Sequence, residues 1–236
     1  MGNSKKAGLI VIKKVVPAIK YIDRERDMIS KSQPPQTVPT RFGTFVQHTF
    51  TENDTGKQHL ALALGSWCKS KPVPVRIHSE CLTGDVFGSA KCDCGDQLNL
   101  ALELFQTWGV GLLIYLRQEG RGIGLANKIR AYQLQDQGFD TVDANLALGF
   151  SADGRSYDCV FEILNHLDVG SVQLLTNNPD KILAIENLGI NVSGRIPIEP
   201  TIKSESANYM RTKMERMGHI LSPKAEVLKF EAVCNR

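Results

Sequence analysis

The sequence lacks any hydrophobic run that approaches the roughly 18 apolar residues a membrane helix needs, so we expect no membrane partner. It also lacks an internal repeat and a low-complexity tract. Its net charge is only +3, which is too small for the field of a typical nucleic-acid-binding protein, and we expect no nucleic-acid partner. A pocket for a polyanionic small molecule is compatible with this charge.

A secretory signal peptide and the cysteine spacing of a disulfide framework are also missing. Two of the six cysteines, Cys92 and Cys94, are separated by a single residue, which disfavours such a framework. Acidic residues at positions 23, 25 and 27 argue against a transit peptide. A reducing compartment fits these absences, and we expect a cytoplasmic protein.

The composition, 42% hydrophobic and 22% charged, is ordinary for a globular protein. A polar Ser-Gln-Pro-Pro-Gln run at 32–36 indicates a boundary. We expect an N-terminal extension of unknown role at 1–36, one large domain at 37–222 and a C-terminal tail at 223–236.

Short apolar runs alternate with helical patterns after residue 36. We expect strands at 43–50, 59–65, 73–78, 111–116, 172–175 and 190–196, and helices at 95–107, 122–138, 156–167 and 179–187. This alternation is typical of an α/β domain with a mixed, largely parallel sheet and flanking helices.

Three cysteines, Cys81, Cys92 and Cys94, follow the candidate strand at 73–78. Three thiolates can hold zinc and leave its fourth position for water, as catalytic zinc sites do. The residues alone leave two alternatives open, namely a closed zinc site completed by His78 or Cys68, and three thiols without a metal.

A glycine-rich turn follows the candidate strand at 111–116 and opens a helix. Backbone N–H groups at such a helix start suit anions, and Arg121 could add a contact to a phosphate. Gly120, Gly122 and Gly124 match part of the glycine pattern of a dinucleotide-binding motif. The third glycine is misplaced and Asp143 does not follow a strand, so we reject that interpretation.

Two later segments carry further charge. Lys181 stands in the first turn of a predicted helix, where it opposes the helix dipole unless an anionic ligand is present; a solvated surface lysine is the alternative. Asp153 and Arg155 pair a carboxylate with a guanidinium, although Asp153 or Ser156 could simply cap a helix.

Taken together, these segments resemble GTP cyclohydrolase II, which opens riboflavin biosynthesis. The matching runs are Arg76–Asp85, Cys92–Gly95, Arg117–Leu125, Asn127–Tyr132, Leu148–Phe150, Leu174–Pro179, and Thr212–Lys213 with Gly218–His219. They cover most of the chain, and the resemblance implies the same fold for a catalytic domain at 37–222. We expect no second catalytic domain of the kind that bifunctional members carry ahead of this one, since 36 residues are too few for it.

The resemblance implies a hydrolase that opens the guanine imidazole ring of GTP at C8. It releases formate and pyrophosphate and gives 2,5-diamino-6-(5-phospho-ribosylamino)pyrimidin-4(3H)-one. The resemblance also implies one Zn²⁺ per subunit, Mg²⁺ with GTP, and a homodimer. Water must attack an aromatic carbon of low reactivity, and zinc-bound water is a suitable nucleophile at neutral pH. The alternatives are a paralogue acting on another nucleotide or a pyrimidine, and a non-catalytic module that binds zinc and a nucleotide.

The resemblance also assigns roles to single residues. Cys81, Cys92 and Cys94 would hold zinc, Tyr132 would act in ring opening, Asp153 would accept a proton, and Arg155 would be the residue proposed as nucleophile in pyrophosphate release. GTP would be bound by Arg76, Ile77, His78, Ser79, Glu80, Gln97, Glu119, Gly120, Arg121, Thr141, Thr176 and Lys181. We assign Arg76, Arg121 and Lys181 to the triphosphate, and Glu119 or Gln97 to the guanine edge.

For Arg155 we expect a role other than the nucleophile that the family assigns, for a physical reason. A guanidinium stays protonated and has no free lone pair, so we expect it to stabilise charge at the α-phosphorus. Gly154 and Ser156 flank it where we expect bulkier or acidic residues, and Lys91 stands where arginine is more usual. We expect these departures to affect turnover more than reaction type.

Overall fold

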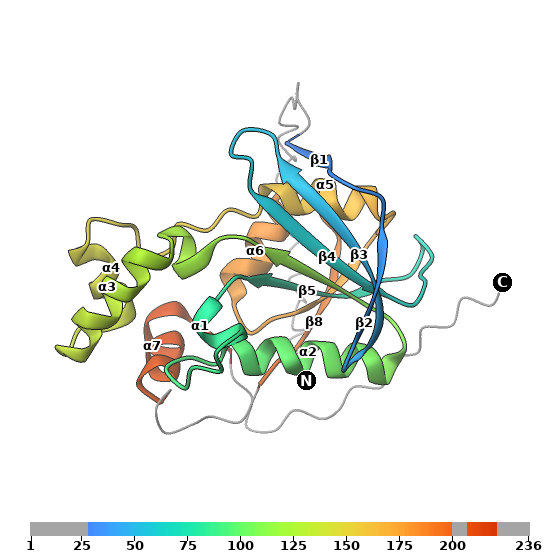
Figure 1. Cartoon of the computed structure of the whole chain (residues 1–236). Helices are drawn as coiled ribbons and strands as arrows, with labels where there is room; N and C mark the ends of the chain where they lie inside the picture. The colour runs from blue at the N-terminus through green and yellow to red at the C-terminus, as the bar shows by residue number, and fades with distance from the viewer. Residues whose placement is uncertain (1–27, 200–206, 221–236) are drawn as a thin grey trace, which may run out of the picture.

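The computed structural model describes residues 28–199 and 207–220 of the 236-residue chain. Its centre is an eight-stranded sheet with the order β1-β3-β4-β6-β5-β7-β8, in which β2 also pairs with β3 (Figure 1). The strands are β1 (Ile29–Lys31), β2 (Gln36–Thr40), β3 (Gly43–Glu52), β4 (Gln58–Leu64), β5 (Val73–Ser79), β6 (Gly111–Leu116), β7 (Val172–Leu175) and β8 (Val192–Ile196). Within the described ranges, no helix is both long and apolar enough to cross a membrane.

The sheet has an antiparallel half and a parallel half. Strands β1 to β4 pair antiparallel, and β4 joins β6 in the same sense. Strands β6, β5, β7 and β8 pair parallel to one another. The predicted α/β class with a mixed sheet is confirmed, and the parallel pairs are confined to one half.

The helices are α1 (Leu82–Asp85), α2 (Cys94–Trp108), α3 (Leu125–Asp136), α4 (Thr141–Ala147), α5 (Asp158–His166), α6 (Pro179–Asn187) and α7 (Ala207–Met217). A short 3₁₀ turn, η1 (Glu119–Gly122), precedes α3. All six predicted strands and all four predicted helices are present, with ends shifted by a few residues. The helix predicted at 122–138 starts later, because Arg121, Gly122 and Gly124 have positive φ angles that an α-helix cannot contain.

Hydrophobic cores lie on both faces of the sheet. One core joins the sheet to α5 and α6 through residues such as Ile77, Ile114, Ile163 and Ile185. The other joins it to α2 through residues such as Phe105. Strands β5 and β6 are buried on both faces, which explains why their sequences are nearly continuous apolar runs.

Two edge strands, β1 and β2, were not predicted. Strand β2 is mostly exposed and contains Pro39, so it carries neither an apolar run nor a clear alternation. Strand β1 lies within the segment predicted as an N-terminal extension, yet Ile29 is 2% exposed and belongs to the core. Most of that segment, and the predicted tail at 223–236, lie outside the described residues, so the division of the chain stays a prediction.

The parallel half determines where a ligand can bind. Strands β5, β6 and β7 end at Ser79, Leu116 and Leu175, and the loops that follow them meet at one edge of the sheet. Ligands of open α/β sheets bind in the crevice at these carboxyl ends. Helices α3 and α4 project from this edge as a lobe, and α7 lies beneath it (Figure 1).

Candidate active site

Two adjoining cavities occupy this edge of the sheet. The first, which we call the cysteine cavity, is lined by the three cysteines together with Tyr132, Lys128 and the glycine-rich turn. The second, the cationic cavity, is lined by Arg76, Lys181 and other polar residues. Four residues line both cavities, namely Ser79, Cys94, Arg121 and Arg155. One elongated ligand could therefore occupy both.

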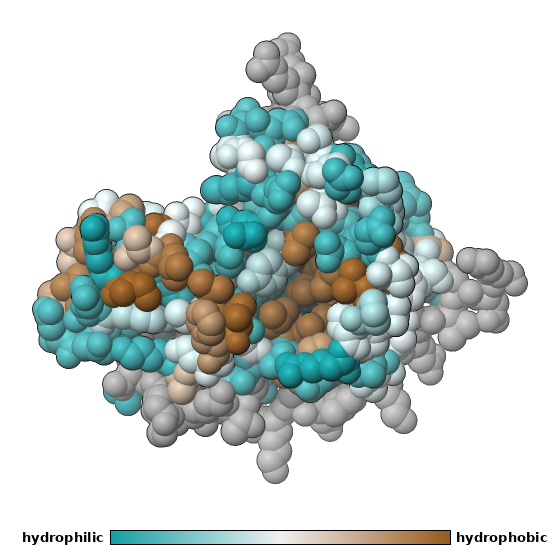
Figure 2. All heavy atoms as spheres, in the orientation of Figure 1, coloured by the Kyte–Doolittle hydropathy of each residue, from teal (hydrophilic) through white to brown (hydrophobic). Residues whose placement is uncertain are grey.

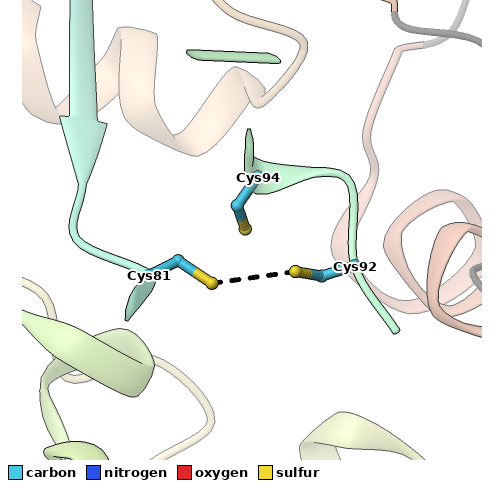
Figure 3. Close-up of side chains that lie close together, drawn as sticks. All are labelled: Cys81, Cys92 and Cys94. Carbon is cyan, nitrogen blue, oxygen red and sulfur yellow. Dashed lines mark hydrogen bonds between the residues drawn. The ribbon is translucent and has the colours of Figure 1, made fainter. Parts of the chain in front are cut away.

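The three predicted metal ligands converge in the cysteine cavity. Cys81 ends the loop after β5, and Cys92 and Cys94 stand at the start of α2. Their Sγ atoms lie within 4.8 Å of one another, and those of Cys81 and Cys92 are 3.7 Å apart. Figure 3 shows the three side chains pointing toward a common centre. Soft thiol donors converging in this way fit a zinc ion.

A closed zinc site, one of the two alternatives for this cluster, requires a fourth protein ligand. Among the residues that the structure describes, neither His78 nor Cys68 belongs to the group of potential ligands around the three thiols. The Cys92 and Cys94 thiols hydrogen-bond to Cys81 and lower its pKa. The same contact with Cys81 raises the pKa of Cys92 to about 11.

Two glycines allow the cysteine loops to approach each other. A Cβ atom at Gly84 would lie 2.9 Å from the Cys92 sulfur and 3.1 Å from the Cys81 sulfur. A Cβ atom at Gly95 would lie 2.1 Å from the carbonyl oxygen of Gly84. A side chain at Gly84 would therefore clash with the sulfur atoms, and one at Gly95 would clash with the Gly84 backbone and separate the two loops.

Asp85 supports the first cysteine and was not identified from the sequence. Its carboxylate accepts hydrogen bonds from the Cys81 backbone N–H at 3.0 Å, His78 Nε2 at 3.0 Å and the Tyr115 hydroxyl at 2.8 Å. Burial lowers the pKa of His78, against the opposing effect of the Asp85 hydrogen bond. His78 therefore contacts the carboxylate that positions the cysteine, and its Nε2 is not a ligand of the cluster.

Glu119 links the cysteine loop to the glycine-rich turn and α3. Its Oε2 accepts from the Leu82 N–H at 2.6 Å, and its Oε1 accepts from the Gly120 N–H at 2.9 Å and Lys128 Nζ at 2.8 Å. Lys128 also lies 3.1 Å from the Cys81 sulfur. Burial opposes the charge of Lys128, but the Glu119 hydrogen bond and the Cys81 charge outweigh it and raise the pKa. Lys128 is a second supporting residue that the sequence did not single out.

Tyr132 lines the cysteine cavity together with the thiols. Its hydroxyl lies 3.4 Å from Thr83 Oγ1, and its ring faces the ammonium groups of Lys91 and Lys128. Burial raises the pKa of Tyr132 to about 12, so the phenol keeps its proton at neutral pH.

The cationic cavity contains side-chain donors without protein partners. Arg76 donates from its Nη atoms to the Leu175 carbonyl at 2.9 Å and to Gln97 Oε1 at 2.7 Å, but its buried Nε has no partner within the described ranges. A buried Nη of Arg121, which lines both cavities, also has no partner there, and neither has the Thr141 hydroxyl in the cysteine cavity. Buried donors are normally satisfied, so three unpartnered ones beside a cavity indicate a ligand rich in acceptors.

Lys181 occupies the same cavity and donates to the Ile77 carbonyl at 2.9 Å. Burial, followed by the charges of Arg76 and Arg155, holds the pKa of Lys181 well below its usual value. A bound anion would offset both effects. The surface-lysine alternative is wrong, since Lys181 is only 5% exposed.

The Asp153–Arg155 pair lies at the junction of the cavities. Arg155 Nε donates to both oxygens of Asp153, at 2.8 and 3.0 Å. Burial acts to raise the pKa of Asp153, but the hydrogen bonds and charge of Arg155 outweigh it and lower the pKa. The loop of this pair packs on the glycine-rich turn so closely that a Cβ atom at Gly122 would lie 2.6 Å from the Gly154 oxygen.

Arg121 adopts a φ of 60°, a left-handed conformation that costs a non-glycine residue about 1 kcal/mol or more. Such strain persists where the surrounding structure enforces it, and functional sites are frequent examples. Here the turn places the guanidinium at the boundary of both cavities.

Most of the predicted site residues line one cavity or both. These are Arg76, His78, Ser79, Glu80, Cys81, Cys92, Cys94, Gln97, Glu119, Gly120, Arg121, Tyr132, Thr141, Arg155, Thr176 and Lys181. Ile77 contributes only its carbonyl oxygen to Lys181, and Asp153 contributes through Arg155. The sequence reading missed Asp85, Asp93, Lys128, Lys213 and His219, although each stands inside or beside a matching run.

The comparisons with known proteins agree with this geometry. The family model described as GTP cyclohydrolase II matches residues 31–197. The GTP cyclohydrolase-2 of Neisseria meningitidis serogroup C is 52% identical over 185 residues, which are 78% of this chain and 93% of that protein. That of Shewanella frigidimarina is 50% identical over 78% of this chain and 92% of its own length. The riboflavin biosynthesis protein RibBA of Bacillus subtilis is 52% identical over 78% of this chain, which matches 47% of the longer relative. The chain therefore belongs to the GTP cyclohydrolase II family.

Proposed function

We propose that this protein is a zinc-dependent GTP cyclohydrolase II that performs the first step of riboflavin biosynthesis. It would hydrolyse GTP at guanine C8 and release formate, pyrophosphate and the diaminopyrimidinone product named above. The observation that carries the proposal is the pair of adjoining cavities, one with three converging thiols and one rich in cations. A nucleoside triphosphate has its base and its phosphates at opposite ends, as this pair of cavities requires.

Cys81, Cys92 and Cys94 would hold the zinc ion. When bound, zinc supplies an acidified water for attack on an unreactive aromatic carbon. Three thiolates would make this centre negative, and Lys128 Nζ, 3.1 Å from Cys81, offsets part of that charge. Tyr132 presents a protonated phenol to the same cavity, where it can orient a reacting group by a hydrogen bond.

Glu119 is the better candidate of the two for hydrogen bonds to the guanine edge. Gln97 is already engaged on the phosphate side by Arg76 and Asp93. Glu119 lines the cysteine cavity, and its Oε2 accepts one hydrogen bond, which leaves a lone pair for guanine N1–H or N2–H. A carboxylate in this role would reject adenine strongly, because the wrong base leaves buried groups unpaired.

Arg76, Arg121 and Lys181 would bind the triphosphate, together with Mg²⁺. Arg155 would stabilise the charge that develops at the α-phosphorus when pyrophosphate leaves. Asp153 holds Arg155 in place, and the same pairing keeps the carboxylate ionised, as a proton acceptor must be.

We also propose a homodimer and a cytoplasmic location. Apolar side chains gather on the face that carries α1 and α3 (Figure 2). Phe87 and Val86, which follow α1, are 73% and 66% exposed. Large exposed apolar residues of this kind are common at contacts between subunits.

The test is incubation of the zinc-loaded protein with GTP and Mg²⁺, followed by identification of the products by mass. We expect formate, pyrophosphate and the diaminopyrimidinone, with no conversion of ATP. The Cys92→Ser variant should lose zinc and all turnover, and the Tyr132→Phe variant should retain zinc while losing formate release. Intact GTP after incubation with the wild-type holoenzyme would refute the proposal. It would favour a paralogue with another substrate or a non-catalytic nucleotide-binding module.

A further inference from the structure

Helix α7 lies against the candidate active site, although the match to the family model ends at residue 197 (Figure 1). Three contacts of the helix and of the segment after it fix it there. Lys213 reaches Asp93 between two of the cysteines, Arg216 pairs with Asp140 and Asp143 of the α4 region, and the Ile220 N–H donates to the Asn177 carbonyl at 2.9 Å. The helix is therefore joined to the cysteine loop, to the α3–α4 lobe and to the turn after β7.

The Lys213 contact is buried. The Lys213 and Asp93 side chains are 8% and 5% exposed, and the Nζ to Oδ1 distance is 2.5 Å. The other carboxylate oxygen of Asp93 accepts from Gln97 Nε2 at 2.7 Å. Because the Gln97 amide nitrogen faces Asp93, its oxygen faces Arg76 and accepts from Nη2 at 2.7 Å. A continuous chain of contacts thus runs from Lys213 on α7 to the arginine whose Nε lacks a partner within the described ranges.

Helix α7 and the segment that follows it supply part of the wall of the cationic cavity. Lys213, Met217 and His219 line it together with Arg76, Arg155 and Lys181. Burial, followed by the nearby charge of Lys213, lowers the pKa of His219 to about 3, so the imidazole is neutral at pH 7. His219 can therefore offer a hydrogen bond, and Lys213 offers a charge.

We propose that α7 and the segment after it are part of the phosphate-binding site. Lys213 and His219 form one wall of this site, and Lys213, through Asp93 and Gln97, positions Arg76 for an oligophosphate chain. The inference rests on the proposed function for the identity of the ligand, a nucleoside triphosphate. It gives Lys213 the role of a positioning residue. Without Lys213, the buried charge of Asp93 would lose its counter-charge and would repel phosphate from the same cavity.

The test is isothermal titration of the full-length, zinc-loaded protein with inorganic tripolyphosphate in the presence of Mg²⁺. Lys213→Met removes the charge and keeps a side chain of similar length, and Lys213→Arg is the conservative variant. Arg211→Met is the matched control, since Arg211 is an exposed cation on the same helix. We expect Lys213→Met to weaken binding at least about tenfold, or about 1.4 kcal/mol. We expect Lys213→Arg to restore most of it, and Arg211→Met to bind like the wild type.

Two further measurements keep the result interpretable. Zinc content and thermal melting show whether each variant is folded and loaded. If Lys213→Met does not fold, the same titration is done with His219→Phe, which we expect to bind tripolyphosphate more weakly. A wild-type affinity of that variant for tripolyphosphate would overturn the inference. A Lys213→Met protein that is folded and binds like Arg211→Met would also overturn it.

Steady-state kinetics with GTP separate the inference from the proposed function. A positioning residue for phosphate should raise KM for GTP more than it lowers kcat. If the wild type leaves GTP intact, the proposed function fails while the tripolyphosphate titration still tests α7. If the wild type turns GTP over and Lys213→Met matches the control in KM and affinity, the inference alone fails.

Discussion

Removal of the Asp85 carboxylate should destabilise the protein and loosen the cysteine loop. In Asp85→Ala, the Cys81 N–H, His78 Nε2 and the Tyr115 hydroxyl lose their acceptor. Each buried donor left unsatisfied costs about 1–3 kcal/mol. Cys81 and His78 are buried whereas Tyr115 is partly exposed, so we assign the full cost of an unsatisfied buried donor only to Cys81 and His78. The expected loss in the free energy of unfolding is therefore about 2–6 kcal/mol, a large part of the ~5–15 kcal/mol typical of a domain.

Asp85→Asn should cost much less, about 1 kcal/mol, because its oxygen keeps an acceptor for Cys81 and Tyr115. Its amide can donate to His78 Nε2 once the ring proton moves to Nδ1, which has no partner among the described residues. Asp136→Ala is the control, since Asp136 forms an exposed pair with Lys91 that contributes about 0–1 kcal/mol.

The assay is urea unfolding of the zinc-loaded proteins, with the rate of zinc loss to a chelator as a second readout. We expect the order wild type, Asp136→Ala, Asp85→Asn, Asp85→Ala in falling stability, and fast zinc loss only in the last. Equal losses for the alanine and asparagine variants at position 85 would refute the reasoning, because the acceptor would then not be what the loop requires. So would an alanine variant within about 1 kcal/mol of the wild type.

Three other outcomes follow from the site. Gly84→Ala should accelerate zinc loss to a chelator, because its Cβ would lie 2.9 Å from the Cys92 sulfur. Gly194→Ala, whose Cβ would have open space around it, should lose zinc at the wild-type rate. Equal rates for the two variants would contradict the steric argument. The lowered pKa of His219 means that the unfolded chain binds its proton first as pH falls, so stability from this residue should be complete above pH 6.5 and decline from there to about pH 3. His219→Gln should flatten that part of the unfolding profile, and an unchanged slope would exclude His219 as its source. Arg155→Lys should slow pyrophosphate release, since one ammonium cannot reproduce the contacts to Asp153; a rate near that of the wild type would rule out a covalent arginine intermediate.

The parts of the fold that the sequence predicts are those where burial alone decides the pattern. Strands β5 and β6 are buried on both faces, and their apolar runs indicate them without knowledge of their neighbours. Helix α1 has only four residues and depends on contacts such as that of Asp85 with Cys81. Helix α4 begins at Thr141 and is capped by Asp140, whose side chain accepts from two backbone N–H groups, but its sequence has no clear amphipathic period. Both elements depend on local contacts that a hydrophobic pattern does not record.

The site divides in the same way. The cysteines are visible in the sequence because their residue type is unusual at those spacings, and the roles of Asp153 and Arg155 follow from the resemblance to the family. The convergence of the cysteines is not visible, because Gly84 and Gly95 bring the loops together through a tertiary contact. Asp93 and Lys213 are 120 residues apart, and no local pattern shows that they pair. Buried ionic contacts of this range are the part of the site that required the structure.

Asp93 gives the two cavities a shared element. It stands between two of the potential metal ligands, and its oxygens hold Lys213 and, through Gln97, the arginine of the cationic cavity. A change in the cysteine loop would therefore shift the groups that we propose to bind phosphate. If metal strengthens oligophosphate binding by some factor, the oligophosphate must strengthen metal binding by the same factor, because the coupling free energy is reciprocal. The proposed enzyme would then hold its metal most tightly while the substrate phosphates are bound.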